Sequence, residues 1–194
     1  MEIEDKLHTL YFNCITELES IGIKVIGSKD VGKIDILVSK RNNKRYGACK
    51  QEDPDKSTMY VERIGRRKII KYLKYNKHTI EISPWVMKLD DMIIKNTIMH
   101  EIIHCMPGCN NHGKTFKEYA KYINLKLGYD ISRVGNKEKD FEKSNIDLKE
   151  EKTFNYRVTC KSCGYTFYRQ RMNKNFTKKY RCGTCMGRFL VEKI

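Results

Sequence analysis

The sequence predicts an α+β protein in two parts, a larger domain followed by a small cysteine-rich module. Three observations support this prediction. An amphipathic stripe opens the chain, short strand-like segments follow between residues 23 and 83, and helical periodicity returns after Pro84. Four of the eight cysteines fall within the last 42 residues. A length of 194 residues suits one medium domain plus a small module.

The composition narrows the class of protein. A hydrophobic content of 40% is enough for a packed core and excludes full disorder. No apolar run approaches the ~18 residues that a spanning helix needs, and the polar, acidic start lacks a secretory signal. We therefore expect a cytoplasmic protein without membrane contact, in which the cysteines bind metal instead of forming disulfides. A monomer is favoured.

The first helix is expected over residues 7–21, where apolar residues recur at steps of three and four until Gly22. Clusters of turn residues then separate six expected strands, of which the fifth could also be a helix. These strands are 24–26, 34–38, 46–51, 59–63, 69–75 and 79–83.

Helices are expected again after residue 83. Ser83 and Pro84 are typical of an N-cap and a first helical position, which predicts a short helix to Leu89. Asp90 or Asp91 can cap a longer helix that ends before residue 107, and a third helix is expected over 114–127. Gly128 stands where a C-terminal glycine belongs.

Residues 134–152 are rich in alternating charge and poor in large apolar side chains, which is typical of a linker with at most a helical turn. The predicted organisation is therefore a domain over 1–133, a charged linker over 134–152 and a small module over 153–194.

The sequence His100-Glu101-Ile102-Ile103-His104 is an HExxH motif. On a helix, residues i and i+4 share one face, so both imidazoles can reach one Zn²⁺. Glu101 can then accept a proton from water that zinc has activated. A catalytic zinc needs a third protein ligand, and His112 is the candidate, with Cys109 as a weaker competitor. Alternatively, a helix carries two histidines and His112 is a polar loop residue.

These residues, with Gly113 and Phe116 after them, resemble the SprT-like zinc metallopeptidase domain, a family that includes the Spartan proteases. The resemblance covers roughly residues 46–127 and the C-terminal segment, and is strongest over 98–117. It implies a zincin-like helical core with a small antiparallel sheet. It also implies that His100, His104 and His112 are zinc ligands and that Glu101 is the catalytic base. The basic stretch 63–77 is longer than the family pattern leads us to expect.

Two CxxC pairs, Cys160/Cys163 and Cys182/Cys185, stand 18 residues apart. Four thiolates at this spacing are typical of a structural Cys₄ zinc site, and short strands around them predict a zinc ribbon. Gly164 and Gly183 are expected to allow the tight turns. A redox CxxC lacks its usual βαβ setting and does not explain two pairs. The sequence thus predicts two Zn²⁺ per chain.

The formal charge of +15 favours a polyanionic partner, with nucleic acid ahead of a membrane surface. Residues 152–194 hold 11 Lys and Arg against one acidic residue, and aromatic residues are interleaved with them. We expect this module to bind DNA, with single strands or junctions preferred. The expected contacts are Arg169, Arg171, Lys174, Lys178, Lys179 and Arg181. A second basic cluster within 63–77 is either another DNA-contacting face or a solvated sheet edge.

The predicted function is a zinc metallopeptidase located with DNA in the cytoplasm, or in the nucleus of a eukaryote. The family resemblance implies a substrate protein that is bound or crosslinked to DNA. Two alternatives remain open. One is a non-enzymatic, zinc-stabilised nucleic-acid-binding or regulatory protein, in which Glu101 has no role. The other is a peptidase that acts on a specific regulator, with DNA incidental.

Overall fold

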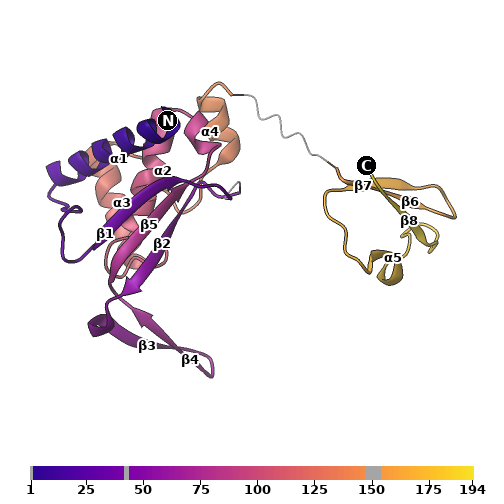
Figure 1. Ribbon diagram of the computed structural model, residues 1–194, viewed down its shortest axis with the longest axis horizontal. Coiled ribbons are helices and arrows are strands. Elements are labelled where there is room, and N and C mark those ends of the chain that lie inside the picture. The colour runs from indigo at the N-terminus through magenta and orange to yellow at the C-terminus, as the bar shows by residue number, and fades with distance from the viewer. Residues whose placement is uncertain (1, 42–43, 147–153) are drawn as a thin grey trace. The chain divides into compact units, whose positions relative to one another are not determined.

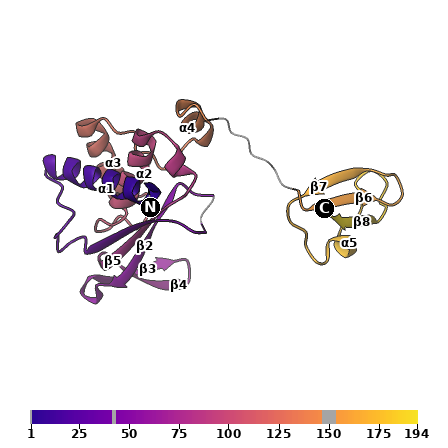
Figure 2. The ribbon, with the colours of Figure 1, turned by 45° about the horizontal axis from the view of Figure 1, so that its top comes forward.

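The computed structural model divides into two compact units, Met1–Asp147 and Leu148–Ile194. It describes residues 2–41, 44–146 and 154–194, so the last part of the expected linker, 147–152, lies outside the described residues. Figures 1 and 2 show three helices of the first unit on one face of a small sheet. No helix in these ranges is long and apolar enough to cross a membrane.

The sheet of the first unit has three strands in the order β1 (Lys33–Val38), β5 (Tyr75–Ile82), β2 (Gly47–Pro54). β2 is antiparallel to β5, but β1 is parallel to it. The expectation of an antiparallel sheet is therefore wrong for one pair. β5 returns between β1 and β2, which run in opposite directions, so it must be parallel to one of them.

The alternation along β5 separates the two faces of the sheet. His78, Ile80 and Ile82 are buried on the side that faces the helices. The other side is polar, and Glu81 there pairs with Lys50 from β2. Because side chains alternate along a strand, this single pattern fixes which face receives the core.

Three helices cover the buried face. α1 (Glu2–Ser20) packs on β1 and on α2 (Asp91–Ile103), while α2 packs on β2 and β5. α3 (Lys114–Leu127) packs on α2. The Asp90 side chain accepts a hydrogen bond from the Met92 N–H (2.8 Å), and Gly128 ends α3 with a φ of 73°. Both caps agree with the sequence prediction.

Two expected elements are different in the structure. Residues 24–26 form no strand, because Val25 alone is buried there and its carbonyl accepts a turn hydrogen bond from Ser28. The expected helix after Pro84 is only a 3₁₀ turn, η2 (Val86–Lys88). The Ser83 hydroxyl donates to the Arg45 carbonyl instead of capping that turn.

The stretch between β2 and β5 forms a hairpin of its own. After the short turn η1 (Lys56–Thr58), strands β3 (Met59–Ile64) and β4 (Arg67–Tyr72) pair as a separate two-stranded sheet. Figure 1 shows it projecting beyond the helices and the main sheet. The length of residues 63–77 is therefore explained by a hairpin arm.

Residues 134–146 contain more structure than a linker requires. α4 (Lys137–Lys143) brings Phe141 onto the Trp85 ring, with stacked centroids 5.6 Å apart. Asp140 accepts a hydrogen bond from the Tyr46 hydroxyl (2.6 Å). This segment therefore packs against the rest of the first unit, which does not end at residue 133.

The second unit is a three-stranded antiparallel sheet, built from β6 (Tyr156–Cys160), β7 (Thr166–Arg169) and β8 (Phe189–Lys193). The strand order is β7-β6-β8, and a single helical turn, α5 (Phe176–Lys179), lies between β7 and β8. Its core is small, consisting of Val158, Cys160, Phe176, Cys182 and Phe189.

Candidate metal-binding sites

Helix α2 presents the two outer histidines of the HExxH motif on one face. His100 and His104 are partly exposed, whereas the intervening Ile102 and Ile103 are fully buried. The ring centroids of the two histidines lie 5.0 Å apart. The buried isoleucines fix the rotation of the helix, so the imidazoles are held at one place.

The turn after α2 brings His112 back to these two residues. Its Nε2 lies 2.9 Å from His100 Nε2 and 3.2 Å from His104 Nε2. Asn110 anchors the turn, because its amide donates to the Tyr72 carbonyl (2.9 Å) and accepts from the Gln51 amide (3.1 Å). The third histidine predicted from the sequence is therefore at the site.

Backbone carbonyls orient the two helical imidazoles. His100 Nδ1 lies 2.9 Å from the Ser132 carbonyl, and His104 Nδ1 lies 2.7 Å from the Cys109 carbonyl. A carbonyl only accepts, so each Nδ1 carries the proton and each Nε2 directs a lone pair inward. Burial lowers the pKa of His100 to about 4 and lowers that of His104, so both rings are neutral near neutral pH.

The donor set fits zinc. Tetrahedral bonds of about 2.0–2.1 Å place two nitrogens about 3.3–3.4 Å apart. The observed separations of 2.9 and 3.2 Å are close to that value. Lone pairs that converge in this way repel one another unless a cation lies between them. The role of His100, His104 and His112 as zinc ligands stays a prediction that this geometry supports.

Glu101 lies on α2 between His100 and His104, and its side chain is directed toward β2. Its side chain is 6% exposed and rests on β2, where the Cys49 backbone N–H donates to its carboxylate. Burial raises the pKa of Glu101 to about 8, which makes its carboxylate a stronger base, and a cation bound to the histidines would favour the ionised form. A carboxylate that lies beside the proposed zinc ligands, and is not itself a ligand, has the arrangement expected of a proton acceptor.

These residues line a cleft of about 990 Å³ in the first unit. β2, α2 and the segment 130–143 form its walls. Among the lining residues, cationic side chains outnumber acidic ones. The cations are Lys44, Arg45, Arg133, Lys137, Lys139 and Lys143, and the acids are Glu101, Asp130 and Asp140.

Several residues that shape this cleft have no direct signal in the sequence. Position 47 is a glycine within a strand, which can indicate close approach of another group, and here a Cβ would lie 2.8 Å from Glu101 Oε1. Ser132 and Cys109 act through backbone carbonyls, which any residue type supplies. In the described part of the chain, the Cys109 thiol does not lie with the donor atoms of the three histidines.

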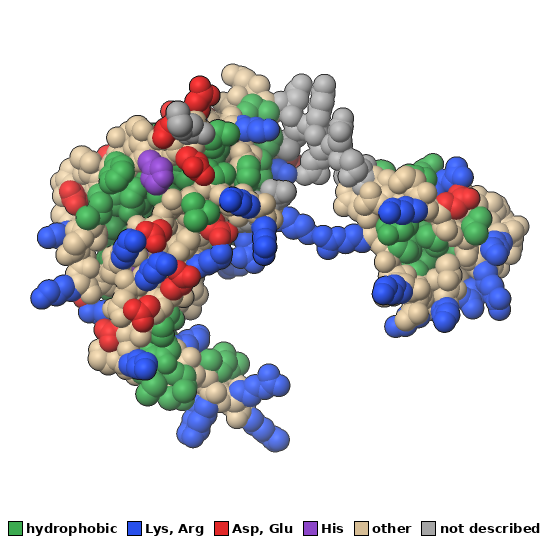
Figure 3. Space-filling model, in the orientation of Figure 1, with side chains coloured by type: hydrophobic (Ala, Val, Ile, Leu, Met, Phe, Trp, Pro, Cys, Tyr) green, Lys and Arg blue, Asp and Glu red, His purple; other side chains and the backbone are tan. Residues whose placement is uncertain are grey.

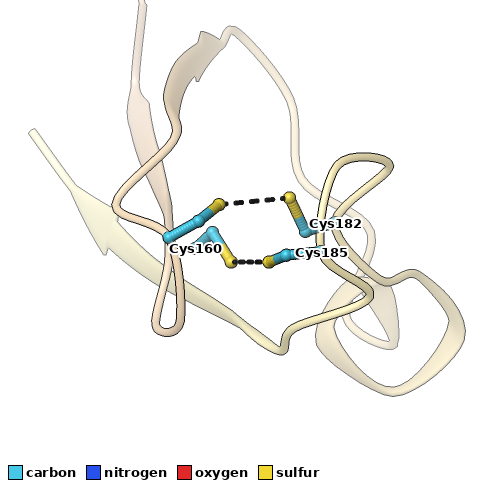
Figure 4. Close-up of side chains that lie close together, drawn as sticks. Cys160, Cys182 and Cys185 are labelled. Atoms are coloured by element: carbon cyan, nitrogen blue, oxygen red, sulfur yellow. Dashed lines mark hydrogen bonds between the residues drawn. The ribbon is translucent and has the colours of Figure 1, made fainter.

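The four cysteines of the second unit also lie together. Cys160 Sγ is 3.4 Å from Cys185 Sγ, and Cys163 Sγ is 3.6 Å from Cys182 Sγ. Figure 4 shows the side chains of Cys160, Cys182 and Cys185 close together. Tetrahedral zinc–sulfur bonds of about 2.3 Å place sulfurs about 3.8 Å apart. A hydrogen bond from the Thr184 backbone N–H is the main cause of the lowered pKa of Cys182, which is about 6. This favours the thiolate.

The two cysteine pairs turn in the same way with different residues. Gly164, four residues after Cys160, has a φ of 75° and donates its N–H to the Cys160 carbonyl. Met186, four residues after Cys182, has a φ of 58° and makes the matching hydrogen bond. The expectation that Gly183 supplies this turn is wrong, because the left-handed position falls three residues later.

The six cations predicted to bind nucleic acid are all exposed, but two have structural partners. The Arg169 guanidinium lies 4.8 Å from the Phe176 ring centroid, and Arg181 donates to carbonyls at the end of α5. Among the described residues, no ion pair involves the other four, Arg171, Lys174, Lys178 and Lys179. Four of the eight aromatic residues of this unit are also exposed, namely Phe154, Tyr165, Tyr168 and Tyr180.

The β3–β4 hairpin carries a second group of cations. Lys71 pairs with Glu62, whereas Arg63, Arg66, Arg67 and Lys68 at the turn are exposed and form no ion pair within the described ranges. Figure 3 shows Lys and Arg side chains spreading from this arm. Exposed apolar residues accompany them, as at Val61 and Ile70, so the arm is more than a charged edge.

A family model described as the SprT-like family matches residues 18–136. The chain belongs to the SprT-like family. One relative is Protein SprT-like from Lactococcus lactis subsp. lactis (strain IL1403), which is 30% identical over 113 residues. The match covers 58% of this chain and 66% of that relative, just under two thirds of its length. The matched family region contains the three histidines, Glu101 and most of the cleft, and ends before the four-cysteine unit.

Proposed function

We propose that this SprT-like chain is a zinc-dependent metallopeptidase that cleaves proteins bound or crosslinked to DNA. The observation that carries the proposal is the convergence of three Nε2 atoms within a cleft that also holds the buried Glu101 carboxylate. A purely structural zinc site is closed by four ligands, whereas three ligands in a cleft leave one position open.

Zinc bound by these imidazoles would supply a Lewis acid that polarises a peptide carbonyl and lowers the pKa of water. Glu101 would accept a proton from the attacking water and deliver it to the leaving amine. The carbonyls of Ser132 and Cys109 keep the Nε2 lone pairs of His100 and His104 directed inward throughout.

The second unit supports a role in holding the chain on nucleic acid. Its exposed Arg171, Lys174, Lys178 and Lys179 side chains can contact phosphates, and its exposed aromatic side chains can stack on unpaired bases. The cationic lining of the cleft is compatible with a substrate presented on a polyanion. Single-stranded DNA or junctions are the proposed partners, because stacking requires accessible bases.

Glu101→Gln tests this function, because it preserves shape and removes the proton acceptor. We expect unchanged zinc content and circular dichroism, but no detectable cleavage of a DNA-bound protein. Glu118→Gln, on the exposed side of α3, is the matched control and should cleave as the wild type does.

Three outcomes contradict parts of the proposal. Cleavage by Glu101→Gln would remove the proposed base. No cleavage by the wild type with any DNA structure would favour the non-enzymatic nucleic-acid-binding alternative. Cleavage that is indifferent to added DNA would favour a peptidase with a specific protein substrate.

A further inference from the structure

A third group of side chains that can bind metal lies close to Glu101, between the main sheet and the end of α2. Cys49, His78 and Cys105 each offer one donor atom, and these atoms all lie within 4.8 Å of one another. Cys49 Sγ is 3.6 Å from Cys105 Sγ and 3.9 Å from His78 Nδ1. None of the three belongs to the two sites predicted from the sequence.

Three different elements bring these residues together. On the β2–β5 pair, Gln51 faces His78 and Cys49 faces Ile80, so Cys49 and His78 are diagonal neighbours on the helix side of the sheet. Cys105 follows the last residues of α2, which packs on both strands. The cluster therefore joins the sheet to the end of the HExxH helix.

The two separations that involve the Cys49 sulfur are close to those of a zinc site. With Zn–S bonds of about 2.3 Å and a Zn–N bond of about 2.0–2.1 Å, tetrahedral angles place two sulfurs about 3.8 Å apart and sulfur and nitrogen about 3.5 Å apart. The observed values are 3.6 and 3.9 Å. The sulfur separation is also the same as between Cys163 and Cys182 in the second unit.

Burial makes the cluster costly without a strong ligand. His78 is 1% exposed, and within the described part of the chain its Nε2 has no hydrogen-bond partner, while its Nδ1 faces the Cys49 sulfur. Buried imidazoles normally have better partners than a thiol at 3.9 Å. A zinc ion with two thiolates and one neutral imidazole carries no net charge, which suits a core position.

We propose that Cys49, His78 and Cys105 bind a zinc ion, separate from the histidine and four-cysteine sites. Both thiols release their protons on binding, so the Cys105 Sγ–H contact with the Glu101 carbonyl (3.5 Å) gives way to a zinc–sulfur bond. Cys49 lines the cleft, which offers the ion a route of entry, and a fourth ligand can come from there. Since the Cys49 N–H donates to the Glu101 carboxylate, the ion also positions that side chain.

The first test counts zinc in the purified full-length chain. We expect Cys105→Ala and His78→Gln each to lose one equivalent of zinc relative to the wild type, with unchanged circular dichroism. Cys14→Ala is the matched control, because Cys14 is a buried thiol on α1 that stands outside all three donor groups, and it should lose none.

The second test uses cobalt in a full-length chain whose four ribbon cysteines are changed to serine. Cobalt at the three histidines has no thiolate ligand, so a thiolate-to-cobalt charge-transfer band must come from the new site. We expect this band in that chain and its loss on adding Cys105→Ala.

Equal zinc content in Cys105→Ala and the wild type, with no thiolate band, would overturn the proposal. Mass spectrometry that shows a disulfide between Cys49 and Cys105 in the untreated protein would also overturn it. Failure of the proposed peptidase function has a different signature. In that case Glu101→Gln and wild type are equally inactive, while Cys105→Ala still loses zinc.

Discussion

The Glu101 carboxylate rests directly on the backbone of Gly47. A Cβ at position 47 would lie 2.8 Å from Oε1 and 2.9 Å from Cγ of Glu101. No side chain other than hydrogen fits between β2 and the proposed base. The edge strand thus determines where the carboxylate lies relative to the three histidines.

Gly47→Ala should therefore displace Glu101 while sparing the metal ligands. Misplacing a catalytic group by about 1 Å or less can lower the rate about 10- to 100-fold. We expect kcat/KM for a DNA-bound substrate to fall in that range, with zinc content unchanged. Wild-type activity in this variant would show that the contact does not position the base, and a lower zinc content would show a wider disruption.

Gly187→Ala should weaken the four-cysteine site. A Cβ there would lie 2.5 Å from Ser162 Oγ and 2.8 Å from Cys160 Sγ, so the two cysteine pairs would be forced apart. We expect faster zinc release to a chelator from this variant. Gly183→Ala is the matched control, because nothing lies within 4 Å of a Cβ at that position. Equal release rates for both variants would contradict the prediction.

The cations between the cysteine pairs should separate into two kinds. Changing Arg171, Lys174, Lys178 and Lys179 to Gln should flatten the salt dependence of single-strand binding, with the logarithmic slope reduced by about 0.7 for each phosphate that is no longer neutralised. Arg169→Gln should instead lower the stability of the second unit, because its guanidinium lies on the Phe176 ring. Fluorescence anisotropy at several salt concentrations measures the first effect, and an unchanged slope would show that these side chains do not bind DNA.

Phe141→Ala should weaken the packing of α4 against the rest of the first unit. Its ring stacks on Trp85, and an aromatic pair of this kind contributes about 0.5–1.5 kcal/mol beyond the area that it buries. Hydrogen exchange over residues 134–146 should accelerate, while exchange in α2 stays slow. Val134→Ala, at a position that is 72% exposed, is the control and should leave exchange unchanged. Slow exchange over this segment in Phe141→Ala would show that other interactions hold it.

The two metal sites could be predicted from the sequence because their ligands are close together along the chain. The i, i+4 spacing of His100 and His104 becomes one helix face, and the turn before Gly113 is short enough to return His112. Helix α3 and the Asp90 cap were predicted for the same reason, since capping and periodicity are local properties. The CxxC pairs likewise define their own turns.

Long-range pairing could be read only from the folded chain. The place of β5 between β1 and β2 makes the sheet mixed and puts Gly47 under Glu101. It also brings Cys49 and His78 beside Cys105, although 29 residues separate the first two and 56 separate the two cysteines. Local spacing was therefore sufficient to indicate which residues could form a catalytic centre and a zinc ribbon. Strand register and helix packing, which depend on contacts between distant segments, set what surrounds Glu101 and which further donors meet.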